Sequence, residues 1–186
     1  MMRLAWLLFF GVISNISFAT ALKKIIIVNE LHDQPRVVYG VNALKKKLQS
    51  LGYPVAVVTK AGTADKNQTL ILINKGFEKG FKKEGFAIRT QKNAISISGA
   101  DASGLLYGCL ELADIAASNG SIPQNISITD APEMVLRGEC IGLQKPYYLP
   151  GRTVYEYPYT EETFPWFYDK KLWIQVLDSM AANRMN

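Results

Sequence analysis

Histidine and cysteine are scarce in this 186-residue sequence, which has one histidine and two cysteines. Two cysteines are too few for a disulfide-stabilised scaffold. Cys109 and Cys140 both fall in apolar segments, so two buried thiols and one bridge are both compatible with the sequence. No Cys/His spacing of the zinc type is present, and we expect no metal and no cofactor. A Ser-His-Asp triad would have to use His32, and the sequence has no nucleophile-elbow motif. His32 is followed by Asp33, a candidate helix cap, so we interpret His32 as a loop residue.

Phosphate-binding loops are also missing. Residues 99–104 begin and end with glycine as such a loop does, but Leu105 and Leu106 stand where Lys and Ser/Thr are required. Gly104 and Gly108 instead lie four residues apart, on one face of a predicted helix, and favour close packing of that helix on a sheet. The positive net charge of +5 is diffuse, and its densest run is three lysines on a predicted helix. Nucleic acid is therefore not an expected partner.

The sequence has no hydrophobic run of the ~20 residues that a membrane-spanning helix needs. Residues 4–16 form a shorter apolar run after Arg3, and small residues around Ala19 fit a cleavage site. This pattern predicts a secretory signal peptide over residues 1–21, with a membrane anchor as the rival interpretation. We therefore expect a periplasmic or extracellular protein without a transmembrane span after cleavage.

Strand and helix patterns alternate between residues 22 and 131. The continuous β-branched run at 24–28 is typical of a strand buried on both faces. Asp101 is placed to begin a helix that Gly120 ends. The expected strands are 24–28, 54–59, 69–74, 85–89, 94–98 and 126–128, and the expected helices are 35–51 and 102–118. This order predicts a small α/β sandwich with a mixed sheet, a domain long enough to bury its own core.

The remaining residues, 132–186, begin at Pro132 and predict a strand at 134–141, a long aromatic loop and a helix at 169–183. Arg137 and Glu139 share one face of that strand, so we expect them to pair inside a barrel, with a direct ligand role as the alternative. A (β/α)8 barrel needs eight strand–helix units. We therefore expect a complete small domain followed by the first unit of a truncated barrel.

The loop between this strand and helix is rich in aromatic residues and prolines. Long loops without regular structure are often functional. Flat rings suit pyranose sugars, whose C–H faces are apolar and whose edges carry hydroxyls. Tyr155, Tyr157 and Trp166 are the candidates for sugar stacking, the alternative being that the rings pack the loop onto the barrel rim.

Three segments together resemble a known family. They are a strand leading into a D-x-x-G-x-x-Y-G helix start at 94–108, an I-x-D-x-P linker at 128–132 and an R-G pair at 137–138. This order resembles glycoside hydrolases of family 20, the β-N-acetylhexosaminidases, and the α-glucuronidases look similar at the strand and helix. The resemblance covers roughly residues 24–186. It implies a non-catalytic α/β domain ahead of a β/α barrel, and a carbohydrate substrate.

The sequence departs from the hexosaminidases just after the R-G pair. Gly142 stands at the family's Asp position and Lys145 at the position of its sugar-binding arginine. Lysine is a point charge where arginine is a two-pronged donor. The resemblance implies that Lys145 contacts a sugar, the alternative being that it points to solvent, and it leaves open a hexosaminidase or a related glycosidase with another sugar preference. The family's catalytic Asp-Glu pair has no counterpart here. The expected substrate-binding residues are Lys145, Arg137, Glu139, Tyr155, Tyr157 and Trp166.

The sequence therefore predicts the N-terminal part of an exported glycoside hydrolase that acts on O-glycosidic bonds of oligo- or polysaccharides. No catalytic residue is expected within this chain, because the acids would lie beyond its end. The alternative is a non-catalytic carbohydrate-binding or domain-organising module of a secreted protein.

Overall fold

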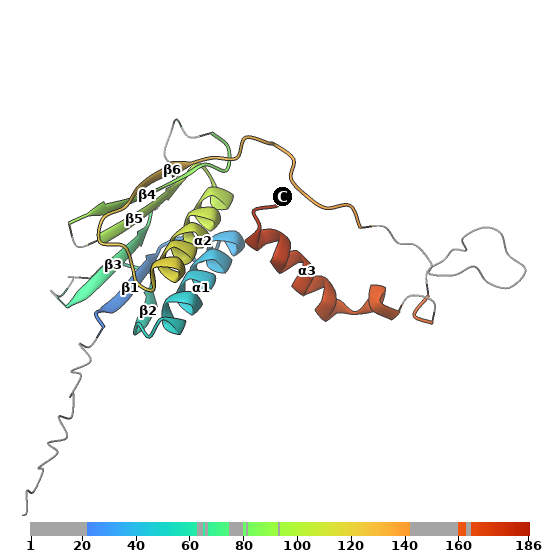
Figure 1. Cartoon of the computed structure of the whole chain (residues 1–186), viewed down its shortest axis with the longest axis horizontal. Coiled ribbons are helices and arrows are strands. Elements are labelled where there is room, and N and C mark those ends of the chain that lie inside the picture. Colours follow the sequence, from blue (N-terminus) through green and yellow to red (C-terminus); the bar gives the residue numbers. More distant parts are fainter. Residues whose placement is uncertain are drawn as a thin grey trace, which may run out of the picture.

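The computed structural model describes residues 22–62, 65, 67–74, 80, 82–92, 94–141, 160–162 and 165–186. These residues form a mixed sheet, two helices packed on it, and a third helix to one side (Figure 1). The strands are β1 (Lys24–Asn29), β2 (Val55–Val58), β3 (Gln68–Ile73), β4 (Phe86–Gln91), β5 (Ala94–Gly99) and β6 (Ser127–Asp130). The helices are α1 (Pro35–Ser50), α2 (Ala102–Asn119) and α3 (Lys170–Ala182), with a 3-10 turn, η1, at Pro165–Tyr168.

The sheet has the order β2-β1-β3-β5-β4-β6. β1 pairs in parallel with β2 and β3, and β3 pairs in parallel with β5. β4 runs antiparallel to both β5 and β6, and β4 and β5 form the expected hairpin. The prediction of a small α/β domain with a mixed sheet is therefore confirmed, with element bounds within a few residues of those expected.

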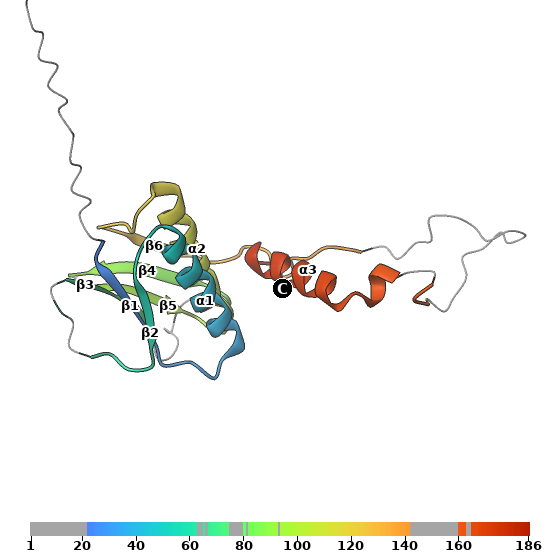
Figure 2. The ribbon, with the colours of Figure 1, turned by 90° about the horizontal axis from the view of Figure 1, so that it is seen from below.

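Helices α1 and α2 pack against each other and cover one face of the sheet (Figure 2). Residues on that face are fully buried, as Ile25 and Ile27 of β1 show, whereas Ile26 between them is only partly buried. The expectation that β1 is buried on both faces holds only in part. Val28, on the same face as Ile26, is 4% exposed, but Ile26 is only partly buried and the described helices cover the other face. The core lies between the sheet and the two helices.

Two glycines allow α2 to approach the sheet closely, as predicted. A Cβ atom on Gly104 would lie 2.1 Å from the carbonyl oxygen of Gly85, and one on Gly108 would lie 2.6 Å from Cγ2 of Ile97. Only hydrogen atoms fit at these two positions. The D-x-x-G-x-x-Y-G pattern is thus explained by packing of the helix on β4 and β5.

The ends of the helices are only partly as expected. Asp101 caps α2 by accepting a hydrogen bond from the backbone N–H of Gly104, and Gly120 ends that helix with a positive φ of 66°. For α1, the expectation that Asp33 is the cap was wrong. The residue before the helix is Gln34, which makes no side-chain cap bond, and Pro35 starts the helix without needing a hydrogen-bond acceptor.

The segment after β6 runs along the edge of the molecule toward α3 (Figure 1). The prediction of a strand at 134–141 was wrong, because these residues form no strand and Met134, Val135 and Leu136 are 70–83% exposed. A strand needs a neighbour to take its backbone hydrogen bonds, and no described strand lies beside this segment. The helix predicted at 169–183 is confirmed as α3, and Asp169 caps it.

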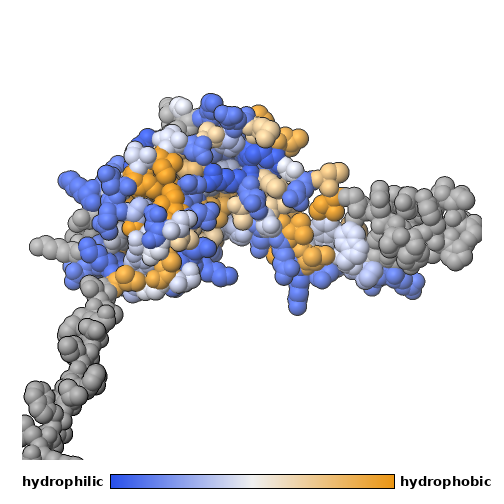
Figure 3. Space-filling view, in the orientation of Figure 1, coloured by the Kyte–Doolittle hydropathy of each residue, from blue (hydrophilic) through white to orange (hydrophobic). Residues whose placement is uncertain are grey.

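No residue of α3 is fully buried. Ile174 and Leu177 are 49% and 59% exposed, while Leu172, Val176 and Met180 are half-buried. Figure 3 shows hydrophobic residues gathered on the surface of this part of the molecule. Among the described residues, α3 therefore lacks a partner that covers its apolar side.

The two cysteines differ in environment and do not bond to each other. Cys109 is fully buried in α2, where burial raises the pKa of its thiol to about 12, and Cys140 is exposed. The prediction of a buried thiol is therefore confirmed for Cys109 and wrong for Cys140. The segment around Cys140 forms no strand and leaves this side chain exposed. No helix in the described part of the chain has the length and apolar character to cross a membrane.

Candidate functional site

The structure describes three of the six predicted substrate-binding residues. Arg137 lies at a junction where four segments of the chain meet, Glu139 is part of the same segment two residues further on, and Trp166 lies in the turn before α3. Lys145, Tyr155 and Tyr157 lie outside the described residues. The described part of the candidate site is therefore the surroundings of Arg137.

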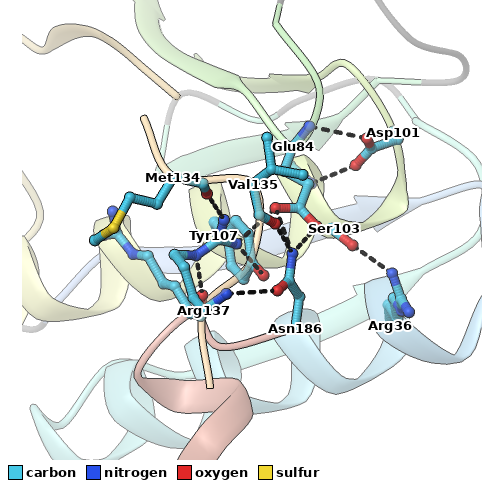
Figure 4. Close-up of polar contacts among 11 residues, drawn as sticks. Arg36, Glu84, Asp101, Ser103, Tyr107, Met134, Val135, Arg137 and Asn186 are labelled. Carbon is cyan, nitrogen blue, oxygen red and sulfur yellow. Dashed lines mark hydrogen bonds and ion pairs between the residues drawn. The ribbon is translucent and has the colours of Figure 1, made fainter. Parts of the chain in front are cut away.

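The centre of this junction is an ion pair between Arg137 and Glu84, with 2.6 Å between Nη2 and Oε2 (Figure 4). Their side chains are only 16% and 7% exposed. The same nitrogen donates to the hydroxyl of Tyr107 at 3.2 Å, and the guanidinium lies 5.8 Å from the centre of that ring. Arg137 is therefore paired with Glu84 rather than with Glu139, which corrects the predicted pairing.

The remaining nitrogens of Arg137 donate to backbone carbonyls. Nη1 bonds the oxygen of Met134 at 2.6 Å, and Nε bonds the oxygen of Arg184 at 2.7 Å. All three guanidinium nitrogens thus hold protein acceptors. Arginine suits this position because its planar fork can donate in several directions at once.

Asn186 completes the junction. Its side-chain nitrogen donates to both Glu84 carboxylate oxygens, at 3.1 and 3.3 Å, and to the Val135 carbonyl. Its side-chain oxygen accepts from the Arg137 backbone N–H, and its own N–H donates to the Arg137 carbonyl at 2.9 Å. We call Glu84, Tyr107, Arg137 and Asn186 the Glu84–Arg137 junction. It ties the segment after β6 and the residues after α3 to the α/β domain.

Glu84 is held in place by the start of α2. Its backbone N–H donates to Asp101 Oδ2 at 2.9 Å, while the other Asp101 oxygen caps the helix at Gly104. Glu84 itself has a φ of 60°, a conformation that non-glycine residues seldom adopt. The turn that leads into β4 and the N-terminus of α2 therefore share one carboxylate, and together they aim the Glu84 side chain at Arg137.

The surroundings of Glu84 favour its charged form. Burial alone would raise the pKa of this carboxyl, but hydrogen bonds from Arg137 and Asn186 and the positive charge of Arg137 outweigh burial and lower the pKa. For Arg137, the hydrogen bond to Glu84 raises the pKa further above its already high ordinary value. Both groups are therefore ionised at neutral pH.

The lowered pKa of Glu84 predicts how the stabilising effect of the junction depends on pH. A carboxyl whose pKa is lower in the folded state stabilises the fold above its unfolded pKa, which is near the ordinary value of 4.5. That stabilisation is lost as the pH falls through the folded pKa. We expect the difference in free energy of unfolding between the natural chain and Glu84→Gln to be constant near neutral pH and to shrink below pH 4.5. Urea unfolding of both proteins across this range measures it, and a difference that grows on acidification would contradict the pairing.

A second arginine strengthens the same contact. Arg184, just after α3, pairs with Glu111 of α2 and, at 3.3 Å, with Asp130 at the end of β6. Its guanidinium lies 5.5 Å from the centre of the Phe86 ring. Because the Arg184 carbonyl also accepts from Arg137, the two arginines form one connected network along the side of the α/β domain.

A groove of about 600 Å³ separates α3 from the starts of α1 and α2. Tyr39 crosses it to donate a hydrogen bond to the Asp178 carbonyl at 3.3 Å. Burial, and then the charge of Asp178, raise the pKa of Tyr39. Arg36 binds the Ser103 hydroxyl on the α/β side of the groove. Polar contacts with the domain thus come from the C-terminal part of α3 and the residues after it, and the N-terminal end of α3 points away from the domain (Figure 1).

The junction is unsuited to acid–base catalysis. A general acid works best with a pKa raised toward neutral pH, whereas the pKa of Glu84 is lowered and its oxygens are occupied by Arg137 and Asn186. Asp101 is occupied by two backbone N–H groups. The residues that the structure describes also contain no cluster of His, Cys, Asp and Glu that could hold a metal ion.

Trp166 belongs to a cluster of aromatic rings at the start of α3. Its ring lies 6.2 Å from that of Phe167 and 6.1 Å from that of Trp173, and it remains 37% exposed. Trp173 donates from its indole nitrogen to the Phe167 carbonyl at 2.7 Å. The rings therefore pack the turn onto α3, while the exposed part of Trp166 leaves its predicted sugar contact as a prediction.

Sequence reasoning missed Glu84, Asn186 and Arg184. Glu84 lies in a Gly/Lys-rich connection with no periodic pattern, so nothing marks it as the partner of Arg137. Asn186 and Arg184 follow α3, 49 and 47 residues after Arg137. The one available signal was that Arg137, a charged residue in an apolar stretch, needs an oppositely charged partner. That signal led to the nearest acid, Glu139, and not to Glu84.

Comparison with solved structures finds matches to glycoside hydrolases. A GH138 enzyme described as targeting pectin rhamnogalacturonan II matches 88% of this chain with 42% identity and a TM-score of 0.72. A GH115 4-O-methyl-α-glucuronidase, described as specific for decorated arabinogalactans, matches 88% with 17% identity and a TM-score of 0.56. A Streptomyces plicatus β-hexosaminidase matches 63% with 19% identity and a TM-score of 0.44. A scan of protein-family models and a search of curated proteins give no match.

This chain is thus similar in structure to the N-terminal parts of glycoside hydrolases, as the sequence motifs predicted. The second match shares the fold, whereas the GH138 enzyme also shares more than two fifths of the aligned residues. The chain spans about a quarter of the length of each of these solved structures, 23%, 24% and 23% in the order given.

Proposed function

We propose that residues 22–186 are the N-terminal part of an exported glycoside hydrolase that acts on O-glycosidic bonds of oligo- or polysaccharides. The observation that carries this proposal is the match to the GH138 enzyme, because 42% identity over 88% of the chain reaches beyond the sheet into residues 132–186. A shared fold alone would not indicate a shared function. Here the similarity includes the segment that follows the α/β domain.

For the substrate, we propose an acidic polysaccharide of the pectic type. The GH138 enzyme is described as targeting pectin rhamnogalacturonan II. The departures from the hexosaminidase pattern at Gly142 and Lys145 support a sugar other than N-acetylhexosamine. A lysine ammonium suits a carboxylate or a hydroxyl group of the sugar. Lys145, Tyr155, Tyr157 and Trp166 remain the proposed substrate contacts.

We place the catalytic carboxylates outside residues 22–186. Glycosidases use two carboxyl groups about 5–10 Å apart, one of them with a raised pKa. Glu84 is paired with Arg137, and the neighbouring Asp101 accepts hydrogen bonds from the backbone N–H groups of Glu84 and Gly104. The α/β domain therefore supports the hydrolase by anchoring residues 132–137 and the residues after α3.

A domain-organising role without catalysis is the second candidate. The observation that favours it is that the two arginines and Asn186 all hold one segment of the chain against another. The two candidates differ in whether the complete protein hydrolyses a glycoside.

The proposal is tested with the protein encoded by the complete reading frame that contains these residues. We expect it to release sugar from rhamnogalacturonan fragments and to be much less active on aryl N-acetyl-β-hexosaminides, with products separated by chromatography. The second substrate is the control for sugar preference, because the hexosaminidases act on N-acetylhexosamines. Absence of turnover on every glycan tested would favour the domain-organising role.

Export gives a separate prediction. We expect the mature protein to begin near Thr20 or Leu22, because a positive start and the apolar run at 4–16 precede the small residues around Ala19. N-terminal sequencing of protein recovered from the exporting cell measures this directly. An intact Met1 on protein from the cytoplasm would contradict it.

A further inference from the structure

A cavity lies at the end of the sheet opposite the Glu84–Arg137 junction. It has a volume of about 310 Å³ and is bounded by the first residues of β3 and β5, the last residues of β4, and the loops that follow α1 and α2. Glu84 precedes β4 and Thr90 is near its end, so roughly 20 Å separates the two places at about 3.3 Å per strand residue. The cavity is therefore distinct from the junction.

The lining of this cavity combines an apolar floor with polar groups. Ile95 and Ile122 supply the floor, and the polar groups include Lys23, Lys92, Tyr53 and Thr90. Such a mixture is typical of small-molecule sites, whose volumes are roughly 300–1,000 Å³. At the lower end of that range, the cavity suits one sugar ring.

Two of the hydroxyls are fixed by the backbone with their hydrogens left to donate. The Tyr53 oxygen accepts from the N–H of Ile122 at 3.2 Å, and the Thr90 oxygen accepts from the N–H of Ile126 at 3.0 Å. Each hydroxyl can also donate one hydrogen bond. Both are thus oriented donors for the oxygen atoms of a ligand.

The charged groups of the lining are both positive. Lys23 and Lys92 stand at the rim, and none of the described residues that line the cavity is acidic. In the last turns of α1 and α2, next to the cavity, backbone N–H groups of Leu51, Gly52 and Gly120 bond the carbonyls of Lys47, Leu48, Gln49 and Ala117. The two lysines therefore favour a ligand with a negative charge over a neutral one.

We propose that this cavity is a binding site for a carboxylate-bearing sugar unit, which lets the α/β domain hold an acidic polysaccharide. The two lysines bind the carboxylate, Tyr53 and Thr90 donate to ring hydroxyls, and Ile95 and Ile122 contact the apolar face of the sugar. The identity of the polymer rests on the proposed function, but binding at this cavity does not require turnover.

The test is a titration of the mature chain, residues 22–186, with α-1,4-linked trigalacturonate, followed by amide NMR. We expect saturable shifts at Thr90, Ile95 and Ile122, and much weaker binding of the neutral α-1,4-galactotriose. Lys23→Gln with Lys92→Gln should weaken trigalacturonate binding about tenfold or more, since hydrogen bonds to charged groups are lost. Both lysines are exposed, so the fold is expected to survive.

Lys46→Gln is the matched control, because it removes an exposed positive charge on α1, away from the cavity. It should leave the affinity unchanged. Three results would each overturn the inference: Lys46→Gln weakens trigalacturonate binding as much as the double variant does, the double variant binds as tightly as the unchanged chain, or the amide shifts do not saturate. If trigalacturonate did not bind at the cavity but the complete protein hydrolysed rhamnogalacturonan fragments, only the proposed binding site would be rejected. If trigalacturonate bound but the complete protein hydrolysed no glycan, only the proposed function would be rejected.

Discussion

Replacing Arg137 by alanine is expected to lower the free energy of unfolding by about 3 kcal/mol, because it leaves the Glu84 carboxylate buried without its cation. The loss lies toward the low end for buried pairs, since Arg137 retains 16% exposure. Bonds to the Met134 and Arg184 carbonyls and to the Tyr107 hydroxyl are lost with it. Urea unfolding of the purified chain measures the change.

The matched control is Arg36→Ala, which removes an exposed arginine whose side chain bonds a neutral hydroxyl, that of Ser103. We expect its effect to stay below about 1 kcal/mol. A double-mutant cycle of Arg137→Ala with Glu84→Gln isolates the pair, and the double variant should lose less than the two single losses added together. Additive losses would show that Arg137 and Glu84 do not stabilise each other.

Replacing Gly104 by alanine is expected to have a comparable or larger effect, a loss of at least about 3 kcal/mol. The added methyl carbon would sit 2.1 Å from the Gly85 carbonyl oxygen, and a backbone atom cannot move aside as a flexible side chain can. The intrinsic gain of about 1 kcal/mol for alanine over glycine in a helix is too small to offset this clash. Thermal and urea unfolding both report the loss.

Two other glycines calibrate this prediction. Gly108→Ala should be milder than Gly104→Ala, because the nearest atom is the Cγ2 of the Ile97 side chain at 2.6 Å. Gly62→Ala should be nearly neutral, because nothing lies within 4 Å of the added atom. If Gly104→Ala proved as harmless as Gly62→Ala, the close packing of α2 on the turn before β4 would be wrong.

The fold of the α/β domain could be predicted from the sequence because its signals are local. The β-branched run at 24–28, the helical spacing in 35–51 and the cap at Asp101 each depend on neighbours within one element. The sequence could not predict whether one or both faces of β1 are covered by helices. A continuous apolar run is compatible with either arrangement, and the number of covered faces depends on where the helices pack.

The junction could not be predicted because its partners are far apart in the sequence. Arg137 was singled out correctly as a charge in need of a partner, but its partner is Glu84, 53 residues earlier. The largely apolar stretch 134–141 also predicted a strand, whereas this segment is fixed by side-chain bonds from Arg137 and Asn186. An apolar stretch forms a strand only where another strand is there to pair with it.

The most direct test of the account compares sugar release by two purified proteins on the same rhamnogalacturonan fragments. One is the 186-residue chain and the other is the product of the complete reading frame that contains it. We predict release by the complete product and none by the homogeneous 186-residue chain. The reason is that Glu84 is paired with Arg137, Asp101 is bonded to two backbone N–H groups, and we place the catalytic carboxylates elsewhere. Turnover by the 186-residue chain alone would contradict the account.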